Sequence, residues 1–226
     1  GGSGQGLPYP NQNTDPCATI KAQNESTNYK IKLNEYNKAS NFSEKKEKGF
    51  YETKDGWFYS LEQSQSTSSS DGLKFPISND IKGYTHIHLN DYEDGTTDEN
   101  GAPRERQPIR MFSPADVNAL MELAKLQSNG NYGDLYGVML SSSGNYTIKF
   151  TGTATDIKTG FDTQEWRNSY RDFIKNESGS LEKKFLRFLS EKMGINGISL
   201  FKNNSDGKTQ KKSLSSNNNV QTTDCP

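Results

Sequence analysis

The chain has 226 residues, of which 27 are basic and 28 acidic, giving a net charge of −1, and only 30% are hydrophobic. The mean hydropathy of −0.96 therefore predicts one main domain with long polar loops and tails. The balanced charge, without a basic stripe of interleaved aromatics, argues against nucleic-acid binding, and apolar stretches such as Tyr136 to Leu140 are far shorter than the roughly 20 residues of a membrane span.

The ends of the chain differ in composition from its middle. Residues 1–16 begin with GGSGQG and are predicted to be a flexible linker or tag, either a cloning remnant or a Gly-rich tether to an upstream anchor or domain. Residues 17–210 are predicted to form a single domain, with a core at about 42–152 and a helical C-terminal extension at 160–202. Residues 203–226 are predicted to be a polar tail.

The first third of the chain changes from helical to strand-like spacing. Pro16 to Asn41 has the spacing of one weak helix or two short ones. Apolar and aromatic residues on both sides of Asp55-Gly56 predict a β-hairpin, because Asp-Gly is a strong turn signal. The serine-rich stretch Gln63 to Asp71 is predicted to be a mobile loop.

A strand with alternating faces is predicted at Gly83 to Leu89, which reads GYTHIHL. Side chains alternate across a strand, so Tyr84, His86 and His88 should share one face. The following stretch, Asn90 to Gln107, is acidic and is predicted to be a loop without regular structure.

A well-signalled helix follows. Ser113 has the position of an N-cap, Pro114 suits the first helical turn, and apolar residues recur at helical spacing afterwards. Leu135 to Ser141 and Tyr146 to Thr151 then alternate as two strands joined by a short turn.

The last elements are predicted to be two helices and a short strand. Asp162 to Lys175 begins with a capping-box arrangement, Leu181 to Met193 is a second helix, and Gly197 to Phe201 is a strand. Together these elements predict an α/β fold, in which a mixed, mostly antiparallel sheet is flanked by helices.

Two cysteines, Cys17 and Cys225, lie near opposite ends of the chain. Their placement suggests a disulfide that joins the termini, and such a bond would imply an oxidising compartment and an exported protein. Two unrelated free thiols are an equal alternative, because spacing alone does not establish a bond.

The only two histidines, His86 and His88, are expected to coordinate one metal ion, which we expect to be zinc, because imidazoles two residues apart on a strand point the same way. Asp116 is the best candidate for a third ligand. It lies in the first turn of the helix that Ser113 begins, where the helix dipole favours an anion.

The pattern His86-Ile87-His88 followed by Ser113-Pro114-Ala115-Asp116 resembles the metal motif of the JAMM family, zinc metalloproteases of the MPN fold. The resemblance implies an MPN-like core, Zn²⁺ held by the two histidines and the aspartate, and hydrolysis of peptide or isopeptide bonds in a peptide or protein substrate. It also implies a glutamate general base, for which Glu47 is the nearest counterpart, with Glu52 and Glu62 as weaker ones. Ser113 would steady the oxyanion.

The chain departs from the family pattern in two places. Leu89 replaces the usual proline after the second histidine, and 24 residues separate His88 from Ser113. The extra length is the loop Asn90 to Gln107, which we expect to form a lid or a substrate-selecting insert. A non-catalytic interaction module that retains the fold, with or without the metal, is therefore an alternative. The simplest alternative is a pair of surface histidines without a metal, with Asp116 serving only as a negative charge at the N-terminus of its helix.

Overall fold

The computed structural model describes residues 15–64, 72–161 and 163–226. Most of the predicted linker, most of the serine-rich loop and the Asp162 cap lie outside these residues. The helices are α1 (Pro16–Glu25), α2 (Thr27–Tyr36), α3 (Ala39–Phe42), α4 (Pro114–Lys125), α5 (Thr163–Asn176) and α6 (Leu181–Arg187), with a 3₁₀ turn η1 (Ala154–Asp156) and a π-helical turn η2 (Phe188–Lys192).

The strands are β1 (Gly49–Thr53), β2 (Phe58–Ser60), β3 (Glu62–Gln63), β4 (Leu73–Lys74), β5 (Ile81–Ile87), β6 (Tyr92–Thr97), β7 (Pro103–Arg106), β8 (Tyr136–Leu140), β9 (Asn145–Phe150), β10 (Ile198–Asn203), β11 (Thr209–Leu214) and β12 (Val220–Asp224). Eight of them form one sheet in the order β12-β11-β10-β9-β8-β5-β1-β2, while β3-β4 and β6-β7 are separate two-stranded ribbons. Among the described residues, β5 and β8 pair in parallel and the other neighbours pair antiparallel.

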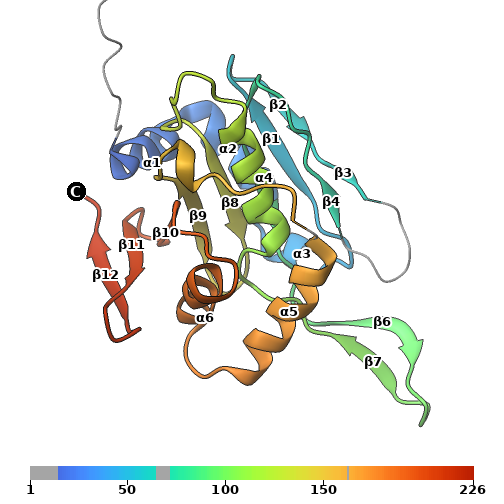
Figure 1. Cartoon of the computed structure of the whole chain (residues 1–226). Coiled ribbons are helices and arrows are strands. Elements are labelled where there is room, and N and C mark those ends of the chain that lie inside the picture. The colour runs from blue at the N-terminus through green and yellow to red at the C-terminus, as the bar shows by residue number, and fades with distance from the viewer. Residues whose placement is uncertain (1–14, 65–71, 162) are drawn as a thin grey trace, which may run out of the picture.

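Helices cover both faces of the large sheet, so the molecule has three layers (Figure 1). On one face, Tyr29 and Tyr36 of α2 pack against Phe50 of β1 and Ile87 of β5. On the other face α4, α5 and α6 bury a larger apolar cluster against β5, β8, β9 and β10. The predicted fold class, a mixed and mostly antiparallel sheet flanked by helices, is thus confirmed. None of the described helices is both long and apolar enough to cross a membrane.

Two segments differ from the sequence-based prediction. The expected irregular loop Asn90 to Gln107 contains the hairpin β6-β7, in which Arg106 pairs with Asp94 at 2.8 Å. Its turn carries Asn100-Gly101, and Gly101 has the positive φ of 79° that such turns need. The hairpin extends away from the body of the molecule (Figure 1).

The expected polar tail, residues 203–226, forms β11 and β12 and completes the sheet. The turn before β11 contains Asp206-Gly207, with a φ of 84° at the glycine. Partly buried lysines and threonines replace the apolar residues of a typical strand, and Lys212 donates to Thr222 across the pair at 2.9 Å. The segment is therefore polar in composition but regular in structure.

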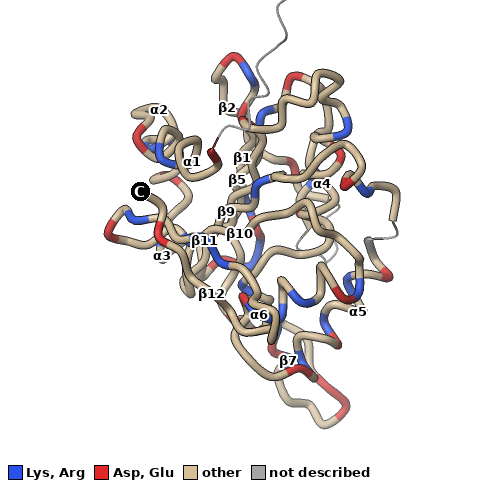
Figure 2. Tube along the Cα trace, turned by 60° about the vertical axis from the view of Figure 1, so that its left-hand side comes forward, with Lys and Arg blue, Asp and Glu red and all other residues tan. Residues whose placement is uncertain are grey.

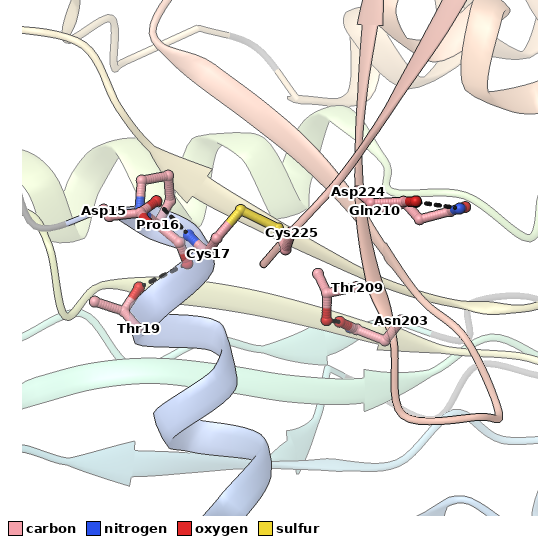
Figure 3. Close-up of a disulfide and its surroundings, with 9 residues drawn as sticks. All are labelled: Asp15, Pro16, Cys17, Thr19, Asn203, Thr209, Gln210, Asp224 and Cys225. Carbon is pink, nitrogen blue, oxygen red and sulfur yellow. Dashed lines mark hydrogen bonds between the residues drawn. A yellow bond between two sulfur atoms is a disulfide. The ribbon is translucent and has the colours of Figure 1, made fainter.

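A disulfide joins Cys17 of α1 to Cys225, which follows β12, so the bond suggested by the sequence is confirmed (Figure 3). The two cysteines are 208 residues apart in sequence. The bond ties the first helix to the outer strand of the sheet, at the edge where the side chains are mostly polar. A disulfide is also compatible with an extracellular location.

Removal of this bond should lower the free energy of unfolding by up to about 5 kcal/mol, because it restricts a long loop in the unfolded chain. The Cys17→Ser/Cys225→Ser double variant and the wild type would be compared by denaturant unfolding. Either single variant should behave like the double one. Equal denaturation midpoints for the wild type and the double variant would show that the disulfide does not stabilise the fold.

Lys149 on β9 is buried and donates to the carbonyl of Gly133 at 2.8 Å. Burial lowers its pKa to about 8, against the opposing effect of Asp134. This pKa lies below the unfolded value of 10.5, so the unfolded chain binds the proton more tightly. The free energy of unfolding must therefore rise as the pH increases from about 8 to 10.5.

The wild type should therefore gain about 2 kcal/mol between about pH 7.5 and about pH 10 relative to Lys149→Met. Denaturant unfolding of both proteins across this range would measure the difference. Parallel pH profiles would show that Lys149 is not the group responsible.

Candidate metal centre

His86 and His88 lie at the end of β5 and point to the same side of the sheet, as their alternation predicts. Strand β5 is held between β1 and β8, and the backbone N–H of His88 donates to the carbonyl of Leu140 at 2.8 Å, which extends the parallel pairing beyond the strand. Both side chains are buried, and their Nε2 atoms lie 2.9 Å apart. The two rings therefore converge on one point.

Asp116 reaches the same point from α4. Its Oδ1 lies 3.3 Å from Nε2 of His86, and its Oδ2 lies 3.9 Å from Nε2 of His88. A capping box fixes this carboxylate, because its Oδ2 accepts from the backbone N–H of Ser113 at 2.6 Å while the Ser113 hydroxyl accepts from the N–H of Asp116. Tyr84 on β5 donates to the Asp116 carbonyl at 2.5 Å, which fastens the start of α4 to the sheet.

The backbone around the histidines leaves room for this convergence. Gly49 of β1 lies directly opposite His86 in the ladder, and a Cβ at this position would lie 2.7 Å from Cβ of His86. A larger residue would therefore displace the imidazole. Gly137 of β8 plays a similar part for Tyr84, whose hydroxyl would lie 2.5 Å from an added Cβ.

The geometry of the three side chains could hold a metal ion. Each offers one ligand atom, all of these atoms lie within 4.8 Å of one another, and all three residues are buried. His88 contacts the carbonyl of Ile109 through Nδ1 at 2.6 Å, so that nitrogen carries the proton and the lone pair on Nε2 faces the common point. Two nitrogens and one carboxylate oxygen suit zinc.

His86 is neutral near physiological pH. Burial lowers its pKa to about 4, although Asp116 opposes this effect and the neighbouring His88 adds to it. The backbone of Val138 also opposes the lowering of this pKa. A neutral imidazole keeps the lone pair that a metal requires, and a simple His–Asp ion pair would need the charged form instead.

The three candidate glutamates occupy different surroundings. Glu47 lines the same cleft as the metal-ligand candidates, just before β1, where the N–H of Ile87 donates to the carbonyl of Lys48 at 3.0 Å. Glu52 is buried on the opposite face of the sheet, where it accepts from Tyr136 at 2.8 Å. Glu62 is exposed on β3. Of the three, Glu47 alone lines the cleft.

The cleft above the three ligands has a volume of about 700 Å³. Its lining includes Ser113 and Asp116 at the start of α4, apolar surface from Phe75 and Ile109, and one side of α5. Helix α5 was not predicted to belong to the site, although it places four polar side chains there: Arg167, Tyr170, Arg171 and Lys175. Their spacing along one helix face was the available signal.

Tyr170 brings a hydroxyl into this wall without a hydrogen-bond partner among the described residues. The side chain is buried, and both burial and the nearby Asp116 raise its pKa well above the ordinary tyrosine value. The hydroxyl is therefore protonated at all ordinary pH values and can act only as a neutral hydrogen-bonding group.

No family model, curated protein or solved structure matches this chain. The candidate metal centre is therefore defined by its own residues and geometry.

Zinc supplied to the purified protein should bind at close to one ion per chain, and His88→Ala or Asp116→Ala should weaken binding by at least about tenfold, because each removes a ligand. Elemental analysis after gel filtration and a competition titration with a chromogenic chelator would measure both quantities. Glu122→Ala on the same helix is the matched control and should bind normally. Undiminished binding in the ligand variants would place the metal elsewhere.

Proposed function

We propose that this protein is a zinc-dependent hydrolase of peptide or isopeptide bonds, similar in its motif to the JAMM metalloproteases. The observation that carries the proposal is the convergence of two buried histidine nitrogens and the Asp116 carboxylate at the bottom of an open cleft. Three protein ligands leave a further coordination position, which is the arrangement of catalytic rather than structural zinc sites.

A zinc ion held by these residues would lower the pKa of water to about 7 and polarise the substrate carbonyl. Glu47 is the proposed general base and acid. From the wall of the cleft it would take a proton as water adds to the carbonyl, and then give that proton to the departing amine. Its position supports this role. Gly49 pairs with His86, and the N–H of Ile87 donates to the carbonyl of Lys48, so the pairing of the two segments extends to the residue next to Glu47.

Ser113 is proposed to steady the developing oxyanion. Its hydroxyl oxygen accepts from the backbone N–H of Asp116, so the hydroxyl hydrogen is not used in that bond. The side chain lines the cleft, where this hydrogen could be donated to an oxyanion. A preorganised donor of this kind is worth about a hundredfold or more in rate.

The proposal also includes an exported location and a role for the β6-β7 hairpin. An exported location suits the disulfide that joins Cys17 to Cys225. The β6-β7 hairpin begins soon after His88, and Glu105 and Arg106 at its base line the cleft. We propose that this insert helps to select the peptide substrate.

Glu47→Gln should lower the rate of hydrolysis by about a hundredfold to ten-thousandfold while leaving zinc binding intact, because it removes proton transfer but no ligand. A mass-spectrometric screen of zinc-loaded protein against a peptide library and isopeptide-linked model substrates would identify cleaved bonds, and kcat would then be measured on the best substrate.

Glu62→Gln, which neutralises an exposed glutamate outside the cleft, is the matched control and should retain the full rate. Full activity of Glu47→Gln would contradict its assignment as the base. Stoichiometric zinc without any cleavage would reject the hydrolase and favour an interaction module that retains the metal.

A further inference from the structure

Three basic residues form a row along the helix that faces the metal centre. Arg167, Arg171 and Lys175 follow one another at intervals of four on α5, so they occupy one face of the helix. All three are exposed and all three line the cleft that contains His86 and His88. Blue segments mark the basic residues of α5 in Figure 2.

This basic row has no acidic ion-pair partner among the residues that the structure describes. By contrast, Arg106 at the base of the hairpin is paired with Asp94. Like charges four residues apart also disfavour an isolated helix. The row therefore costs the fold a little stability, and no acidic side chain in the described part of the chain offsets its charge.

The charges around the cleft are separated by side. The acidic lining residues, Glu47, Glu105 and Asp116, come from the strand side, the hairpin and α4, whereas α5 contributes only basic and uncharged side chains. A ligand that crosses the metal centre would meet positive potential along α5. Guanidinium groups bind carboxylates through paired N–H donors, which makes an acidic side chain the best match for Arg167 and Arg171.

We propose that the cleft selects peptide substrates with glutamate or aspartate residues next to the bond at the metal, and that the basic row binds those carboxylates. This inference rests on the proposed hydrolase function for the identity of the ligand as a peptide. Apolar surface from Phe75 and Ile109 would contact the intervening backbone and side chains.

The experiment compares two fluorescent peptides that differ only in glutamate against glutamine. Their binding to the zinc-loaded Glu47→Gln protein, which keeps the peptides intact, would be measured by fluorescence anisotropy. The glutamate peptide should bind about tenfold more tightly, since three exposed charge pairs each contribute a small gain. The preference should shrink as salt is added.

The triple variant Arg167→Gln/Arg171→Gln/Lys175→Gln, in the same background, should lose this preference. Its matched control is Lys21→Gln/Lys30→Gln/Lys38→Gln, which removes the same charge from exposed positions at the helices on the opposite face of the sheet. Zinc content and melting temperature would establish that both variants are folded. Equal affinity for the two peptides, or a preference that survives in the triple variant of the row, would overturn the proposal.

Cleavage of a peptide library by the zinc-loaded wild type separates this proposal from the hydrolase itself. Cleavage without enrichment of acidic residues would reject the acidic specificity and leave the hydrolase standing. Selective binding of the glutamate peptide without cleavage of any peptide would reject the hydrolase and retain the recognition of acidic peptides.

Discussion

The candidate centre depends on the position of one carboxylate. Asp116 closes the capping box of α4 through the N–H of Ser113, and the same side chain faces both imidazoles. Tyr84, from the histidine-bearing strand, holds the carbonyl of Asp116. The start of the helix is therefore fixed to β5 by contacts on both the side chain and the backbone, so the ligands meet without a flexible loop between them and the sheet.

The two faces of the sheet handle buried charge differently. Opposite the metal centre, Glu52 is matched by Lys82 at 3.3 Å and by the Tyr136 hydroxyl. These contacts satisfy the carboxylate within the protein, which is the usual state of a buried charge. On the metal face, the facing nitrogens of His86 and His88 and the Asp116 carboxylate are brought together by rigid elements. These three side chains could hold a metal ion, and under the proposed function the basic row of α5 would bind an anionic ligand beside it.

Local patterns in the sequence predicted the three ligand residues, because each pattern involves only residues that are close together in the chain. Strand alternation placed the two histidines on one face. Ser113-Pro114 marked the start of the helix that carries Asp116. The β6-β7 hairpin and the strands β11 and β12 were not predicted, since their residues are polar on both faces and lack an apolar alternation, although Asn100-Gly101 and Asp206-Gly207 marked their turns. The role of α5 depended on tertiary packing, which no local pattern specifies.

Under the proposed function, one zinc ion lies between these three side chains. Crystals of the zinc-loaded protein, measured on both sides of the zinc absorption edge, test it directly. A zinc ion bound by these residues should give a single strong anomalous peak about 2.0 to 2.2 Å from Nε2 of His86, Nε2 of His88 and a carboxylate oxygen of Asp116. A peak elsewhere, or no peak at this position in zinc-loaded crystals, would contradict it.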